Sequence, residues 1–167
     1  MVRVLLVDEA HVAREILDEA FAHASLIYRT VGVKLVWSEI GEPSKHAFVV
    51  KIVSTSLAGT SPGDRALGIA PKGKNQRGRH AWVFYRRIED RANVLRMSSG
   101  VLLGVVLAHE IGHLLLPRNW QSDVGLMRRT WDANHIQKAM WGLLDFTAKE
   151  RELIRSRLHD SASRLAN

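Results

Sequence analysis

The spacing of apolar residues divides the first half of the chain into strands and one long helix. A β-rich run at residues 2–7 predicts a first strand. From Val12 to Val31 the apolar residues recur every three or four positions, which predicts an amphipathic helix over residues 9–31 that ends at Gly32. Further β-rich segments predict strands at residues 33–37, 47–53, 66–70 and 81–85.

A strongly apolar helix is predicted next. Residues 101–116 are apolar almost throughout, and Ser98 or Ser99 provides the cap at which the helix begins. Pro117 ends it, because proline lacks the backbone donor and disfavours helical geometry in the residue before it.

The C-terminal tail is predicted to form two more helices. The first covers residues 132–144, and the capping box of Thr147 and Glu150 begins a final helix that runs to Leu158. Strands that precede a run of helices in one chain of this length predict a single domain over residues 1–167 with an α/β (α+β) fold.

Composition places the chain among soluble globular proteins, with 46% hydrophobic and 25% charged residues. Cysteine is absent, so a metal ion would be held by histidine, carboxylate or amide groups. The N-terminus lacks the features of a signal peptide, and segment 101–116 is too short to span a bilayer. No membrane partner is expected, and the compartment is left open between the cytoplasm and export with a leader already removed.

The net charge of +7 admits a nucleic acid or another anionic partner. The basic residues are scattered, however, except in the Gly-rich stretch at residues 72–79, which has the composition of a surface loop. No recognised nucleic-acid motif accompanies that stretch, so no nucleic-acid partner is expected. The same charge is compatible with acidic substrates.

The motif His109-Glu110-Ile111-Gly112-His113 carries the chemistry of the chain. Histidines four residues apart lie on one face of a helix and can bind a single metal ion. The glutamate then lies near the open coordination position, where it can take a proton from a zinc-activated water. Ionisable side chains inside an apolar helix are costly unless they are paired or bind a metal. The motif therefore predicts a zinc site with Glu110 as general base.

The segment after the motif resembles that of the metzincin clan of zinc peptidases, in which a third ligand and a methionine-containing turn follow the helix. The likeness is closest to small bacterial metzincin-like proteins, whose segment runs roughly H-E-I-G-H-L-L-L-G-x-N-x-H-S-x-x-G-I-M-R-x-x-W. This chain matches at residues 109–116 and at Asn119, Ser122, Gly125, Met127, Arg128 and Trp131. Weaker likeness covers most of the chain. Two departures are Pro117 in place of glycine and Gln121 in place of the third histidine.

The third zinc ligand has three candidates, since a catalytic zinc normally has three protein ligands. Gln121 occupies the position of the third histidine in the resemblance. Asp123 is the better ligand chemically, because a carboxylate binds zinc more strongly than a neutral amide oxygen. Asn119 lies six residues after His113, where the shorter H-E-x-x-H-x-x-G-x-x-H pattern places its last histidine.

The resemblance also implies a fold. It implies a metzincin-like, mixed, mostly parallel twisted sheet with an antiparallel edge strand, packed on a long N-terminal helix and an active-site helix. Residues 1–116 would form an N-terminal subdomain, and residues 117–167 a C-terminal subdomain with the Met-turn and helices. Met127 would pack beneath the imidazoles without binding the metal. The edge strand of the substrate cleft would be formed by Leu67, Gly68 and Ile69.

Other residues with the right chemistry have simpler explanations. His135, His80 and His11 are isolated histidines, which are more often surface or core residues than ligands. Glu150 could be the distant glutamate ligand of another H-E-x-x-H clan, but its place in a capping box accounts for it. Trp131 is interpreted as a core aromatic residue with no catalytic task.

The resulting hypothesis is a zinc (Zn²⁺) metalloendopeptidase, a monomeric hydrolase that acts on a peptide or protein substrate. The alternative is a catalytically weakened or inactive metzincin-like protein that binds metal or peptide, because Gln121 replaces the usual third histidine. Glu110 favours the enzyme, since a mere scaffold needs no base beside the metal.

Overall fold

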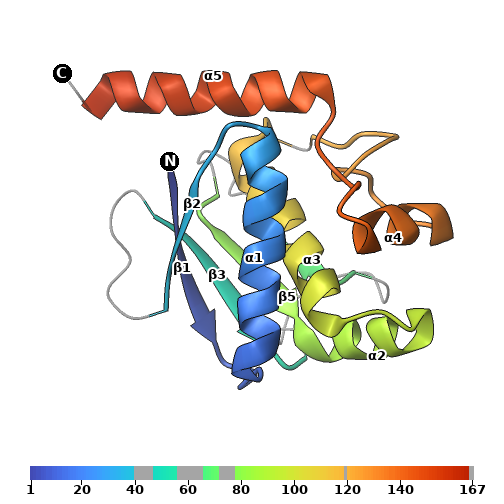
Figure 1. Ribbon diagram of the computed structural model, residues 1–167. Helices are drawn as coiled ribbons and strands as arrows, with labels where there is room; N and C mark the ends of the chain where they lie inside the picture. Colours follow the sequence, from blue (N-terminus) through green and yellow to red (C-terminus); the bar gives the residue numbers. More distant parts are fainter. Residues whose placement is uncertain (40–46, 56–65, 72–77, 119, 166–167) are drawn as a thin grey trace.

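A computed structural model describes residues 1–39, 47–55, 66–71, 78–118 and 120–165 (Figure 1). The described strands are β1 (Val2–Asp8), β2 (Leu35–Ser38), β3 (Phe48–Val53), β4 (Gly68–Ile69) and β5 (His80–Phe84). The described helices are α1 (Arg14–Thr30), α2 (Tyr85–Leu95), α3 (Ser99–Leu115), α4 (Ala133–Met140) and α5 (Ala148–Leu165). The chain therefore has an α/β fold.

The five strands form one mixed sheet in the order β2-β1-β3-β5-β4. The first three pairings are parallel, and β4 pairs antiparallel with β5 at the edge. The register places Val50 beside both Leu6 and Ala81, and all three side chains are buried. The predicted mostly parallel sheet with an antiparallel edge strand is confirmed.

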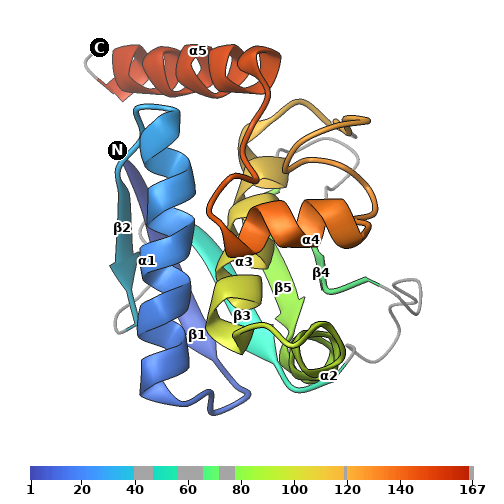
Figure 2. The ribbon, with the colours of Figure 1, turned by 45° about the vertical axis from the view of Figure 1, so that its right-hand side comes forward.

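Helices α1 and α3 pack side by side on one face of this sheet (Figure 2). Gly104 permits their close approach, because a Cβ atom there would stand only 2.7 Å from the carbonyl oxygen of Ala20. The buried Tyr28 of α1 donates a hydrogen bond to the carbonyl oxygen of Ala108 in α3 (3.1 Å). Helix α3 is therefore fixed against the N-terminal helix α1.

Helix α1 begins later than predicted. The Asp8 carboxylate accepts hydrogen bonds from the backbone N–H groups of Ala10 (3.0 Å) and Val12 (2.8 Å). This turn satisfies donors that an earlier helix start would have used, so the helix begins at Arg14 and not at residue 9. Gly32, at φ +78°, follows the helix end as predicted.

Helix α2 is the element that the sequence pattern did not predict. Its mostly polar sequence buries only Tyr85, Ile88 and Ala92, at helical spacing, and Tyr85 was assigned to the preceding strand. The strands also differ from the prediction in their bounds, most of all β4, which is confined to Gly68–Ile69 and not residues 66–70, and the ends of two helices differ as well. Helix α4 ends at Met140 and not at residue 144, just before Gly142 at φ +68°, and α5 continues past Leu158.

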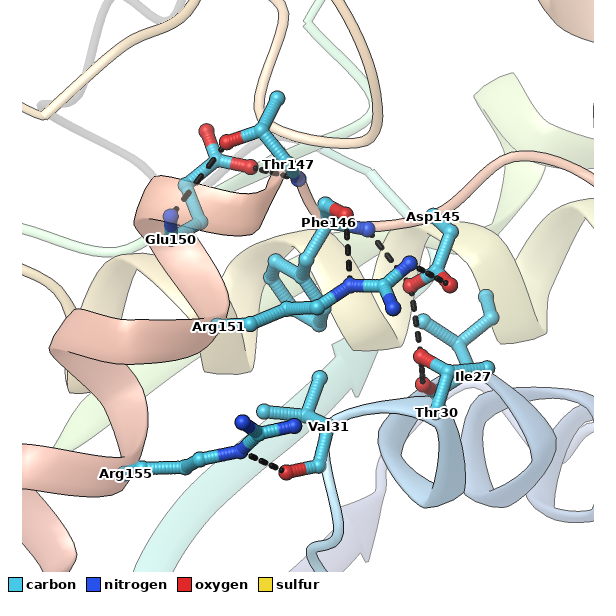
Figure 3. A network of polar contacts seen from close by, with 9 residues as sticks. All are labelled: Ile27, Thr30, Val31, Asp145, Phe146, Thr147, Glu150, Arg151 and Arg155. Atoms are coloured by element: carbon cyan, nitrogen blue, oxygen red, sulfur yellow. Dashed lines mark hydrogen bonds and ion pairs between the residues drawn. The ribbon is translucent and has the colours of Figure 1, made fainter.

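The segment after α4 is tied to the end of α1 by a polar network (Figure 3). The Asp145 carboxylate accepts hydrogen bonds from the Thr30 hydroxyl (2.8 Å) and the Arg151 guanidinium (2.7 Å). Arg155 of α5 donates to the carbonyl oxygen of Val31 (2.8 Å). These bonds hold the start of α5 against the N-terminal helix.

None of the described helices combines the length and the apolar character needed to cross a bilayer. The basic stretch at residues 72–79 lies mostly outside the described residues, as does Asn119, the third-ranked candidate for the third ligand.

Candidate metal centre

Helix α3 presents the H-E-x-x-H residues in its last two turns. The Ser98 hydroxyl caps the helix by accepting from the N–H of Gly100 (3.1 Å), and Leu116 is extended ahead of Pro117, both as predicted. Nearly all of the helix is buried, whereas His109 and His113 are partly exposed. The helix thus places two imidazoles at an accessible surface, while the rest of it lies in the core.

The two imidazoles turn the same nitrogen toward a common point. The Nε2 atoms of His109 and His113 lie 3.0 Å apart, with the ring planes at 88°. Two nitrogens bound to a tetrahedral zinc at about 2.0–2.1 Å would stand about 3.3 Å apart, so the observed spacing is close to that of a ligand pair. Burial lowers the pKa of His109, which keeps its ring neutral and able to bind a metal.

Leu126 fixes the tautomer of His109. Its carbonyl oxygen lies 2.8 Å from His109 Nδ1, which must therefore donate its proton, so that Nε2 carries a lone pair and is the acceptor in its 3.0 Å contact with His113 Nε2. The indole N–H of Trp131 donates to the same carbonyl oxygen (3.2 Å). The Trp131 ring also meets the His109 ring edge to face, with centroids 5.3 Å apart. Such outer contacts orient the ligating histidines of metal sites.

Trp131 is therefore a residue whose role sequence reasoning missed. The sequence interpretation makes it a core aromatic, and it does pack half-buried against the core, but its ring also meets the first histidine of the motif. The sequence signal that could have shown this role is the spacing of Trp131, four residues after Met127, which matches the pattern of the metzincin-like proteins that the chain resembles. Composition and periodicity alone do not reveal it.

Glu110 is buried beside the histidine pair, with only 4% of its surface exposed. Its Oε2 atom has no hydrogen-bond partner among the described residues. Burial away from water raises the pKa of this carboxyl to about 8. A buried carboxylate oxygen without a partner is costly unless a ligand or a proton satisfies it, which makes Glu110 a candidate functional residue.

Gly68 of the edge strand lies directly against Glu110. A Cβ atom at residue 68 would come within 2.7 Å of Glu110 Oε1 and within 3.0 Å of two further atoms of that side chain. Glycine is therefore required for the edge strand to approach the carboxylate this closely.

These side chains line one cleft with a volume of about 480 Å³. One wall comes from the edge strand and the residues after it, and the other from the segment that follows α3. The described lining residues are Gly68, Ile69, Ala70, Pro71, His109, Glu110, His113, Arg118, Trp120, Gln121 and Arg129. The structure thus brings the motif and two residues of the predicted edge strand together, whereas Leu67 is not among the lining residues.

The described candidates for the third ligand differ in whether they line the cleft. Gln121 lines the cleft, and the N–H of the adjacent Ser122 donates to the carbonyl oxygen of Met127 (3.2 Å), which holds this segment in place. Asp123 is exposed and is not among the described residues that line the cleft. Within the described part of the chain, no three His, Asp or Glu side chains converge on one point. Gln121 as third ligand stays a prediction.

The isolated histidines do not reach the cleft. His11, His80 and His135 are absent from its described lining. His135 Nδ1 instead lies 2.7 Å from a carboxylate oxygen of Asp132, and this contact lowers the pKa of Asp132 to about 2.

Met127 packs directly below the motif helix. A Cβ atom at Gly112 would stand 2.6 Å from Met127 Sδ and 3.1 Å from the Phe146 ring. Met127 is fully buried. The glycine inside the motif is thus the residue that makes room for the methionine, so Met127 packs against α3 at the residue before His113.

Glu150 takes the capping role that the sequence predicts. Its carboxylate accepts from the N–H of Thr147 (2.8 Å), and its own N–H donates to the Thr147 hydroxyl (3.3 Å) (Figure 3). The other carboxylate oxygen accepts from the indole N–H of Trp120 (3.1 Å), which lines the cleft. The capping box therefore also fixes one wall of the site.

No protein-family model matches this chain, and no curated protein matches it at a significant level.

Proposed function

We propose that the protein is a zinc metallopeptidase with a metzincin-like site. The observation that carries the proposal is the convergence of two imidazole Nε2 atoms, 3.0 Å apart, in a cleft that also holds a buried glutamate oxygen without a described partner. A structural histidine pair would have no need of a third, unsatisfied ionisable group beside it.

The residues present fit a zinc ion at this point. His109 and His113 would hold it through Nε2, and Gln121, which lines the same cleft, is the first candidate for the third ligand. The Leu126 carbonyl fixes the His109 tautomer that a metal requires. When bound, zinc would polarise the carbonyl of the scissile peptide bond and make a water molecule more acidic.

Glu110 would move the protons of the reaction. As general base it takes a proton from the water that attacks the scissile carbonyl, and it then gives that proton to the leaving amine. Its burial favours this role, because a carboxylate poorly solvated by water is a stronger base.

The edge strand would position the substrate. Among the described strands β4 pairs only with β5, so the backbone groups of its other side are available to an extended peptide. Gly68 lies against Glu110, so a peptide bound along β4 would pass the general base. This arrangement suits cleavage within a chain.

The test is cleavage of a complex peptide mixture by the zinc-loaded protein, read by mass spectrometry. Glu110→Gln should retain zinc but lose cleavage by a factor of at least about 100. The matched control is Glu152→Gln, because Glu152 is exposed on α5, far in sequence from the motif. Cleavage that persists in Glu110→Gln would contradict the mechanism.

A second function is favoured by one observation: no third His, Asp or Glu joins the histidine pair in the described residues. A weakly metallated protein of this kind would bind peptides without hydrolysing them. Gln121→His separates the two functions. If the wild type binds zinc weakly and cleaves nothing while Gln121→His gains both properties, the protein is the inactive form; if the wild type cleaves, it is the enzyme.

A further inference from the structure

We propose that the cleft selects peptides with acidic side chains, and that Arg118 and Arg129 recognise them. The inference rests on the proposed function in taking the cleft as a peptide-binding site, and it adds the class of substrate.

The charges on the cleft wall are the first observation. Apart from the histidine pair, the described lining residues contain three ionisable groups: Glu110, Arg118 and Arg129. Glu110 is buried against the edge strand, whereas both arginines are exposed. Leaving the histidine pair aside, the exposed ionisable groups of the described lining are therefore both guanidinium groups.

The contrast between two neighbouring arginines is the second observation. Arg128 lies 3.1 Å from the Asp132 carboxylate and is neutralised by it. Arg129 forms no ion pair with any carboxylate in the described residues, and its side chain lines the cleft. Asp132 is thus paired with Arg128, which is not among the described lining residues. The positive charge of Arg129 therefore remains available to a ligand in the cleft.

The position of the two arginines in the cleft determines which side chains of a bound peptide they can reach. Both arginines come from the segment after α3, which lines the same cleft as β4 and forms a wall of its own. An extended peptide paired with β4 points alternate side chains to the same side, so residues two apart can reach that wall. A guanidinium binds a carboxylate through two parallel N–H donors, which fits Asp or Glu better than a neutral side chain.

The experiment measures peptide binding and cleavage separately. Fluorescent peptides carry Glu, Gln or Lys at alternate positions, and their affinity for zinc-loaded Glu110→Gln is measured by anisotropy. Arg118→Gln and Arg129→Gln are made in that background. Arg91→Gln is the matched control, because Arg91 is exposed on α2 and removes the same charge without touching the cleft lining. A parallel series with a chelator excludes direct binding of the peptide carboxylates to zinc.

The Glu peptides should bind about fivefold more tightly than the Gln peptides for each arginine engaged, and this preference should decrease with salt. Arg118→Gln and Arg129→Gln should each reduce the preference, and Arg91→Gln should leave it unchanged. Equal affinity for Glu and Gln peptides overturns the inference. So does an equal loss in Arg91→Gln, which would indicate net charge and not the cleft.

Cleavage by the wild-type protein distinguishes this failure from failure of the proposed function. If the acidic preference depends on the two arginines but no peptide is cleaved, the hydrolase proposal fails and the substrate class stands. If peptides are cleaved without regard to their charge, the hydrolase stands and the acidic selection is wrong.

Discussion

The contact between the edge strand and the general base can be tested by adding one methyl group. In Gly68→Ala the new Cβ atom would stand 2.7 Å from Glu110 Oε1. Restoring an ordinary contact distance of 3.4 Å requires a shift of about 0.7 Å. The Glu110 carboxylate is the end of a flexible side chain, so it moves more readily than the backbone of β4.

The two consequences of this shift differ in size. A displacement of about 1 Å in a catalytic group can reduce the rate about 100-fold. Stability should change by less than about 1 kcal/mol, because alanine in a strand regains some of the free energy that glycine loses through backbone entropy. Zinc affinity should change little, since the three atoms nearest the added methyl group all belong to Glu110 and none to a histidine.

The assay compares kcat/KM, zinc affinity and thermal unfolding for the wild type, Gly68→Ala and the control Ile69→Val. Ile69→Val removes a methyl group from the same strand and places no atom near Glu110. We expect loss of activity in Gly68→Ala alone, with zinc binding and Tm close to wild type. Full activity in Gly68→Ala would refute the placement of Glu110 against β4, and loss of zinc would show that the strand supports the metal site itself.

Three further predictions concern the surroundings of the histidine pair. Trp131→Phe keeps an aromatic ring but removes the bond to the Leu126 carbonyl, and it should weaken zinc binding about tenfold in a competition titration; unchanged affinity would contradict a positioning role. Gly112→Ala should lower the free energy of unfolding by about 1–2 kcal/mol through overpacking against Met127. Met127→Ala should cost less stability in the Gly112→Ala protein than in the wild type, and additive losses would contradict the contact between residues 112 and 127. In metal-free protein Glu110 has a pKa of about 8, above its ordinary 4.5, so the folded state holds a proton that the unfolded state releases. The free energy of unfolding should therefore fall as pH rises from 4.5 to 8, and Glu110→Gln should remove this fall; parallel pH curves in chelator would refute the assignment.

Helix α3, which carries the H-E-x-x-H motif, was the part of the chain most open to prediction. A long apolar run, a serine cap and a proline stop specify α3 locally, and its boundaries agree with the structure. The position of Glu150 in a capping box was equally local and is confirmed. The sheet could also be predicted, because its strands are buried and bounded by turn residues.

What could not be predicted depends on tertiary contacts. Helix α2 buries a narrow stripe of three residues, too weak a pattern to outweigh its polar sequence. The Leu126 carbonyl and Trp131 contact His109 although they follow it by 17 and 22 positions in the sequence, and only folding brings them together. The choice between Gln121 and Asp123 likewise depends on which side chain the loop turns toward the cleft.

The central claim is that His109 and His113 bind one zinc ion through Nε2, and X-ray absorption at the zinc edge tests it most directly. The zinc-loaded protein should show two imidazole nitrogens at about 2.0–2.1 Å, and His113→Ala should show one. Failure to bind stoichiometric zinc, or a spectrum that contains no imidazole and does not change in His109→Ala and His113→Ala, would contradict the account.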